Sequence, residues 1–363
     1  MSGDIDHGRR RFLGRAAATI AAGRLGILGA AMPLIDCAAG RLPVEGNMPT
    51  FDGATGWLNS GPLTRDALRG KVVLVDFWTY SCINWIRTVP WLRAWESRYR
   101  DQGLVMVGVH SPEFTFEKDA ASVARATKAM GLRYPIAIDS DHAIWNAFEN
   151  AYWPALYLVD AQGKIRYHHF GEGAFEQIES NIQRLLVEAG GKPSERGAVS
   201  VDARGVEAQA DWSSLRSPEN YLGYDRTERF VSPGGQVLGV LHRYAIPAQL
   251  GQNEWALGGE WKVDHRAIAS SRSEARIGYG FHARDLHLVA GPAAQGRSVR
   301  FRVSIDGRPP GSAHGVDVDA DGNGTMTERR LYQLVRETGR IGDRQFEIVF
   351  LDPDVEAFSF TFG

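Results

Sequence analysis

The spacing of apolar and polar positions divides the chain into two regions of different character. From residue 41 to residue 190, short apolar runs alternate with segments whose apolar residues recur every three or four positions. The runs at residues 72–77 and 104–109 are rich in β-branched residues, which is typical of central strands buried on both faces. This alternation of strands and helices predicts an α/β domain over residues 41–190.

Periodic apolar spacing and turn residues predict the other elements of this domain. They are a helix at residues 90–100, a helix at 120–130, a hairpin at 155–159 and 164–169, and a closing helix at 175–189. In the first of these helices, Leu92 and Trp95 are expected to point inward. Gly131 is expected to end the second helix.

The texture changes after residue 190. Residues 191–211 carry Gly, Lys, Pro, Ser, Arg and Ala without periodicity, which predicts a linker. Residues 212–363 show little helical pattern, and short strands there alternate with Gly, Pro and Asp turns. The expected strands include residues 261–263, 275–281, 286–289, 299–305, 346–350 and 358–362. This spacing predicts an all-β antiparallel sandwich of jelly-roll-like type.

Residues 1–40 have the features of a twin-arginine export signal. Arg9-Arg10-Arg11 precedes an apolar stretch at residues 16–35 that is interrupted by Arg24. A bilayer span needs about 20 strongly apolar residues, and a central Arg is costly there, so we expect no stable membrane anchor. The expected location is the periplasm or cell envelope; a basic disordered N-terminus is the alternative.

Charge and cysteine content limit the function further. A net charge of −2 with 23% charged residues describes an ordinary soluble protein, and no basic block outside the predicted signal suggests nucleic acid. Of the two cysteines, Cys37 lies in the predicted signal, which leaves Cys82 as the single thiol of the mature chain. A lone Cys in an oxidising compartment is either a reactive group or an inert buried thiol.

Cys82 is the main candidate for chemistry. It follows a buried strand and an aromatic turn and opens a predicted helix, whose dipole is expected to favour the thiolate. Asp76, six residues earlier, is a candidate proton acceptor, with backbone capping at the strand end as its alternative. His110 and Glu113 follow the end of the next strand, where sites of α/β folds form; loop packing is their alternative.

These segments resemble the thioredoxin superfamily, and specifically the soluble C-terminal region of DipZ-type thiol-disulfide interchange proteins. Six strings carry the resemblance: residues 77–84 (Phe-Trp-Thr-Tyr-Ser-Cys-Ile-Asn), 87–90, 108–114, 116–117, 217–224 and 358–363. The resemblance implies a thioredoxin-like domain followed by a carbohydrate-binding-module-like sandwich. It also implies that Trp153 and Pro154 form a loop with a cis peptide bond that faces Cys82.

The chain departs from this family at one position that matters. The family's usual site is a Cys-x-x-Cys dithiol, and here Trp85 replaces the second Cys. Cys82 can therefore form a mixed disulfide or a sulfenic acid, and an outside protein thiol or small-molecule thiol must release either one. The expected substrate groove is shaped by these residues: Trp78, Thr79, Tyr80, Trp85, His110, Glu113, Trp153 and Pro154.

Two other functions stay open from the sequence. The first is a catalytically silent protein that binds a cell-envelope partner or a glycan. Its candidate glycan platform consists of aromatic residues of the sandwich: Trp212, Tyr221, Tyr224, Trp255 and Trp261. Packing of these residues in the core is the alternative. The second is a one-Cys peroxidase, suggested by the Thr79-x-x-Cys82 spacing.

We predict no metal and no cofactor. Asp317, Asp319, Asp321 and Glu328 have the spacing of a calcium loop, with calcium as the alternative to a simple turn. A strand precedes them and Pro309-Pro310 interrupts the chain, so no helix leads into the loop. A turn between strands is therefore the favoured interpretation.

Overall fold

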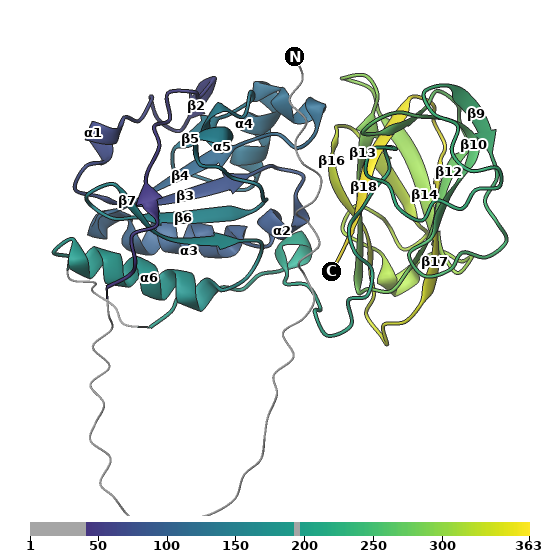
Figure 1. Cartoon of the computed structure of the whole chain (residues 1–363). Helices are drawn as coiled ribbons and strands as arrows, with labels where there is room; N and C mark the ends of the chain where they lie inside the picture. Colours follow the sequence, from purple (N-terminus) through teal and green to yellow (C-terminus); the bar gives the residue numbers. More distant parts are fainter. Residues whose placement is uncertain (1–40, 192–196) are drawn as a thin grey trace, which may run out of the picture. The chain divides into compact units, whose positions relative to one another are not determined.

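Strand β3 (Val72–Trp78) is the centre of the N-terminal sheet (Figure 1). The structure, a computed structural model, describes residues 41–191 and 197–363, so the predicted export signal lies outside the described residues. All seven residues of β3 are buried. The prediction of a strand enclosed on both faces is confirmed.

The N-terminal region contains a seven-stranded sheet with strand order β1-β7-β6-β3-β4-β5-β2. Strands β3, β4 and β5 are parallel, whereas β6 and β7 form an antiparallel hairpin beside β3. Its other elements are β1 (Gly46–Asn47), β2 (Gly56–Leu58), α1 (Arg65–Leu68), α2 (Ile83–Ile86), α3 (Val89–Tyr99), β4 (Leu104–His110), α4 (Ala120–Ala129), β5 (Ile136–Ile138), α5 (Ala143–Ala147), β6 (Ala155–Val159), β7 (Lys164–Phe170) and α6 (Phe175–Glu188).

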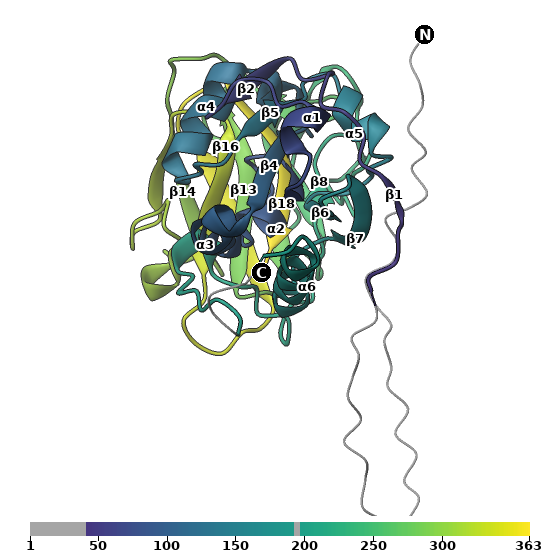
Figure 2. The ribbon, with the colours of Figure 1, turned by 90° about the vertical axis from the view of Figure 1, so that its left-hand side faces the viewer.

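Alternate residues of β3 pack into two different cores, as the two-residue period of a strand requires. Val73, Val75 and Phe77 join the cluster that contains α5. Val72 and Leu74 join the cluster that contains α3, α4 and α6. Helices α3 and α6 lie along the same face of the sheet (Figures 1 and 2), and the ring of Trp91 stacks on that of Phe175 at 3.9 Å.

The C-terminal region is built from antiparallel strands with the order β15-β14-β17-β12-β10-β11-β18-β13-β16, to which β8 and β9 are added. The strands are β8 (Asn220–Tyr221), β9 (Leu241–Tyr244), β10 (Trp255–Val263), β11 (Ile268–Ser270), β12 (Ala275–Phe281), β13 (Asp285–Pro292), β14 (Val299–Ile305), β15 (Asn323–Met326), β16 (Arg330–Arg336), β17 (Arg344–Phe350) and β18 (Val355–Phe362). The antiparallel all-β prediction is confirmed.

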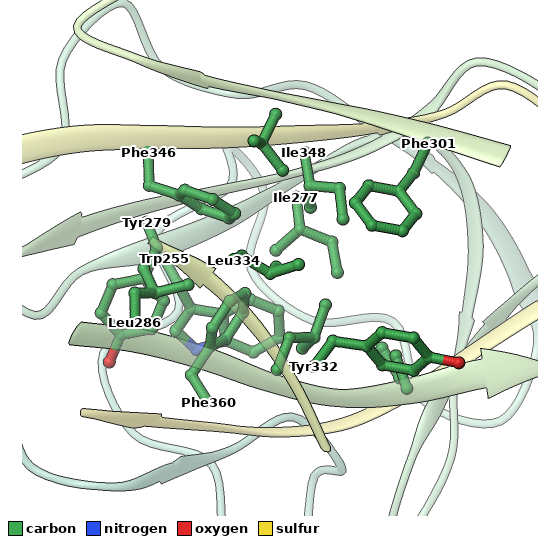
Figure 3. Close-up of a cluster of buried hydrophobic side chains, with 14 of the residues drawn as sticks. Trp255, Ile277, Tyr279, Leu286, Phe301, Tyr332, Leu334, Phe346, Ile348 and Phe360 are labelled. Atoms are coloured by element: carbon green, nitrogen blue, oxygen red, sulfur yellow. The ribbon is translucent and has the colours of Figure 1, made fainter. Parts of the chain in front are cut away.

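Strand β10 joins the two faces of this region. Its first half pairs with β12, and from Gly259 onward it pairs with β9. Gly259 has φ +86°, a conformation that residues with a Cβ adopt only with strain. The bend at Gly259 lets one strand serve both faces. Figure 3 shows the core between them, where the rings of Tyr279 and Phe360 lie 4.9 Å apart.

The outer face of β13, β16 and β18 is also buried. Val289, Leu331 and Phe358 belong to the same apolar cluster as residues of the N-terminal region. The Phe358 ring lies 5.2 Å from that of Phe114 and 4.7 Å from that of Phe116. Residues Leu42–Gly363 thus form one compact unit. Within the described ranges, every helix is too short or too polar to cross a lipid bilayer.

We expect Gly259→Ala to lower the free energy of unfolding by about 1–2 kcal/mol, because a Cβ disfavours the left-handed conformation. Gly339→Ala is the matched control, since the added Cβ there meets open space. Urea unfolding of both variants measures the difference. Equal midpoints for the two variants would show that the bend in β10 does not depend on glycine.

Candidate functional site

Cys82 lies at the end of β3 and forms the N-cap of α2, as the sequence predicts. Its backbone N–H donates to the carbonyl of Thr79 at 3.2 Å, and its own carbonyl accepts from the amide of Ile86 at 2.9 Å. Its side chain packs against the cluster beneath it and remains partly exposed. Cys82 is therefore held at a defined position just beyond the C-terminal end of the central strand β3.

The ionisation of Cys82 differs from the sequence-based expectation. Burial, followed by the negative charges of Glu113 and Glu219, raises the pKa of the thiol well above its ordinary value. The amides of Trp85 and Asn84 lower the pKa, as the start of a helix should, but they do not compensate. Helix α2 has only four residues. At neutral pH the resting Cys82 is consequently protonated.

Trp85 fills the position of the missing second Cys and binds the buried carboxylate of Asp76. Its indole Nε1 donates to Oδ1 at 3.2 Å and to Oδ2 at 3.0 Å. The hydroxyl of Tyr134 donates to Oδ2 at 3.3 Å. Burial raises the pKa of Asp76 to about 7, although both hydrogen bonds lower it. Asp76 is thus directed at Trp85 and Tyr134.

Most of the predicted groove residues form a buried layer of rings. Trp78 stacks on Trp85 at 4.3 Å, and His110 meets the Trp78 ring edge-on at 4.7 Å and stacks on Tyr80 at 5.6 Å. Burial lowers the pKa of His110 to about 3, so this imidazole is neutral. Thr79 is fully buried as well. These residues support Cys82 from within the fold and do not line an exposed groove.

Trp153 and Pro154 lie at the same end of the sheet as Cys82. The register of β3 and β6 pairs Phe77 with Ala155, so the residue before Ala155 lies beside the strand end that leads to Cys82. The peptide bond between Trp153 and Pro154 is cis, as the resemblance implies. The indole of Trp153 donates to the carbonyl of Ser111 at 2.9 Å, which ties this loop to the segment after β4.

Glu117 is a buried carboxylate of this site that the sequence analysis did not single out. It accepts hydrogen bonds from the amides of Glu113 and Phe114 at 2.6 and 2.8 Å, and from the Ser81 hydroxyl at 2.5 Å. Burial raises its pKa to about 7. Glu117 therefore fixes the segment that carries Glu113 to the residue beside Cys82.

The C-terminal region also supplies residues to this site. The hydroxyl of Tyr221 donates to Oε1 of Glu113 at 2.5 Å, and Arg226 forms an ion pair with the same oxygen at 3.2 Å. Arg226 and Glu219 were not predicted as site residues. Tyr221 lies in the string at residues 217–224 that carries the resemblance, and the sequence placed it with the aromatic residues of the sandwich and not with Cys82.

The candidate aromatic platform is not formed. Trp255 and Trp261 are fully buried in the core, and Tyr221 is 8% exposed and is bonded to Glu113. Trp212 is exposed, and the hydroxyl of Tyr224 contacts His265 at 2.8 Å. Core packing is thus the correct interpretation for Trp255 and Trp261.

The candidate calcium loop does not present its carboxylates together. Asp317 pairs with Arg330 at 2.7 Å and accepts from the amide of Gln333 at 2.8 Å. Asp319 accepts from the amides of Asp321 and Asn323, which forms a turn. Across residues 41–191 and 197–363, no group of three or more His, Cys, Asp or Glu side chains could hold a metal ion. The interpretation as a turn is confirmed.

Comparison with known proteins agrees with this geometry. Residues 44–168 match the AhpC/TSA family, and residues 217–363 match the thioredoxin-like C-terminal domain. The protein DipZ of Mycobacterium tuberculosis is 36% identical over 283 residues, which cover 76% of this chain. The chain spans only 39% of the length of that relative.

Two further proteins resemble the N-terminal region. A thioredoxin-like protein in its oxidised form, known from a solution structure, is 34% identical over 39% of this chain and 96% of its own, with a TM-score of 0.37. The thiol-disulfide oxidoreductase YkuV of Bacillus subtilis is 35% identical over 39% of this chain and 95% of its own length. The chain covers nearly all of YkuV at this identity. It therefore belongs to the thioredoxin-like family that contains this thiol-disulfide oxidoreductase.

Proposed function

We propose that the protein is a monothiol oxidoreductase that exchanges disulfides through Cys82. The observation that carries this proposal is the position of Cys82 at the N-cap of α2, beyond the C-terminal end of β3. The cis Trp153–Pro154 bond lies at the same end of the sheet. Trp85 replaces a second thiol. The substrate class is a protein disulfide or a small-molecule disulfide.

The proposed reaction has two exchange steps. The Cys82 sulfur attacks one sulfur of a substrate disulfide, a new S–S bond forms, and the other substrate sulfur leaves as a thiolate that takes up the proton lost by Cys82. A thiol from outside the protein then attacks the mixed disulfide and restores Cys82. Since Trp85 has no sulfur, the second step depends on that outside thiol.

Asp76 is not assigned as the proton acceptor of this reaction. Its two carboxylate oxygens already accept hydrogen bonds from Trp85 and Tyr134. We assign it instead to the support of Trp85. This role follows from the replacement of the second Cys, because the indole N–H now satisfies the buried carboxylate.

A silent binding protein is the second candidate, and the raised pKa of Cys82 favours it. In that case the thiol would be inert and the fold would recognise a cell-envelope partner. A one-Cys peroxidase is the third candidate, supported by the match to the AhpC/TSA family. It would require hydrogen peroxide to convert Cys82 into a sulfenic acid selectively.

We also propose that the chain is exported by the twin-arginine route, on the basis of Arg9 and Arg10 before the apolar stretch at residues 16–35. Replacing both arginines by lysine should stop export, which fractionation of the producing cells would measure. Undiminished export of the double variant would contradict the assignment.

The exchange chemistry predicts a stoichiometry. An aromatic disulfide reagent should release one equivalent of aromatic thiol on reaction with Cys82. In Trp85→Cys the new thiol should attack the mixed disulfide and release a second equivalent. Absorbance of the released thiol measures both, and Cys82→Ser reports the contribution of Cys37.

Trp85→Ala is the matched control for Trp85→Cys. Both variants lose the indole and leave a cavity that costs about 3–5 kcal/mol of stability, but only the Cys variant can close a disulfide. A single equivalent from both variants would show that position 85 does not reach Cys82. Absence of any release from Cys82 in the natural protein would reject the exchange reaction and favour the binding protein.

Asp76 predicts a pH dependence of stability. Because its folded pKa of about 7 lies above the ordinary 3.8, the folded state holds this proton more tightly than the unfolded state. The stabilisation is complete below pH 3.8 and is lost as the pH rises through 7. Between pH 5 and pH 8, Asp76→Asn should remove about 2.5 kcal/mol of that loss. Urea unfolding at pH 5 and pH 8 measures it, with the exposed Asp141→Asn as control; a parallel loss in Asp76→Asn and the natural protein would contradict the assignment.

A further inference from the structure

The C-terminal region contacts the Cys82 site through the segment at residues 220–226. Strand β8 pairs with β18, with Tyr221 opposite Ser359, and the amide of Leu222 donates to the carbonyl of Phe358 at 2.8 Å. These bonds fix the backbone of Tyr221. Its ring belongs to the same cluster against which Cys82 packs.

The turn that follows places Arg226. The amide of Arg226 donates to the carbonyl of Gly223 at 3.3 Å. A Cβ on Gly223 would lie 2.4 Å from backbone atoms of His265 and Arg266, so only glycine allows the turn to lie this close to its neighbour. The segment is consequently held at both ends, by strand pairing and by the tight turn.

Tyr221, Arg226 and Glu113 each contact the other two. The Tyr221 hydroxyl and Arg226 Nη1 both reach Oε1 of Glu113, at 2.5 and 3.2 Å. The Arg226 guanidinium lies 3.3 Å above the Tyr221 ring, a cation–π contact. The Glu113 side chain is only 9% exposed. Its carboxylate is thereby oriented by residues more than one hundred positions away in sequence.

We propose that Tyr221 and Arg226 are positioning residues that hold the Glu113 carboxylate beside Cys82, so that the C-terminal region sets the reactivity of the thiol. This inference rests on the exchange function proposed above and names how the same site is regulated. A bound or moving partner that drew Arg226 away from Glu113 would leave more negative charge beside Cys82 and suppress the thiolate. The ion pair between Arg226 and Glu113 has the opposite effect, because the guanidinium offsets the carboxylate charge and so favours the thiolate of Cys82.

The charges around Cys82 give each substitution a direction. Glu113 and Glu219 oppose its ionisation, and Arg226 offsets the charge of Glu113. Glu117 holds the backbone of Glu113, and the pKa of Glu117 is itself raised by burial. Loss of the Glu113 charge should therefore favour the thiolate. Loss of the Arg226 charge should disfavour it.

The experiment is the pH profile of Cys82 alkylation by iodoacetamide in the folded full chain. Glu113→Gln, which keeps an acceptor for both donors, should shift the profile to lower pH and react several-fold faster at pH 8. Arg226→Met should shift it to higher pH and react several-fold slower, and Arg226→Lys should restore the natural profile. Tyr221→Phe should give a smaller shift in the direction of Arg226→Met. Arg243→Met, an exposed arginine of β9, is the matched control.

The opposite signs separate this role from a merely structural one. If Glu113→Gln and Arg226→Met both accelerate alkylation, the contact only blocks access to the thiol, and the inference is overturned. Unchanged profiles in both variants overturn it as well. If the profiles shift as expected while the aromatic disulfide reagent releases no thiol, the exchange function fails and the positioning role stands. An Arg226 or Tyr221 variant whose profile equals that of the urea-unfolded protein has lost its fold. In that case the profile of Glu113→Gln alone tests the inference, and an unchanged profile overturns it.

Discussion

The hydrogen bond between the Trp85 indole and the Asp76 carboxylate determines how the candidate site is built. A carboxylate on a fully buried strand needs donors, because an unpaired buried charge costs several kcal/mol. Trp85 donates to both oxygens and stacks on Trp78, so one side chain satisfies Asp76 and fills the space below Cys82. With an indole at position 85 the core beneath Cys82 is well packed, and Cys82 carries the one thiol within residues 41–191 and 197–363.

Burial, and then charge from two regions of the chain, opposes the ionisation of the Cys82 thiol. Burial is the larger cause of the raised pKa of the thiol, and the charges of Glu113, from the segment after β4, and of Glu219, from the C-terminal region, add to it. Tyr221 and Arg226 bind Glu113 and determine how its carboxylate lies. Two residues of the C-terminal region thus contact Glu113 directly.

The buried outer face of β13, β16 and β18 explains why the two regions act together. Val289, Leu331 and Phe358 pack against the N-terminal region, and Phe358 contacts the rings of Phe114 and Phe116. An apolar contact of this kind aligns the polar contacts beside it, because packed side chains allow little displacement.

The sequence by itself determined the longer strands and helices and the residues that can carry chemistry, whereas β2, α1 and β5 are too short to show a periodic pattern and were not predicted. The apolar run at residues 72–77 indicated a strand buried on both faces, and Trp85 stands where the resemblance implies a second Cys. Only the tertiary structure decided whether that thiol ionises and what Trp85 does. Local patterns report periodicity, whereas the pKa of Cys82 depends on how deeply the fold buries the thiol and then on the charges of Glu113 and Glu219. The contacts of Arg226 and Tyr221 with Glu113 arise from packing between distant segments, which no local pattern encodes.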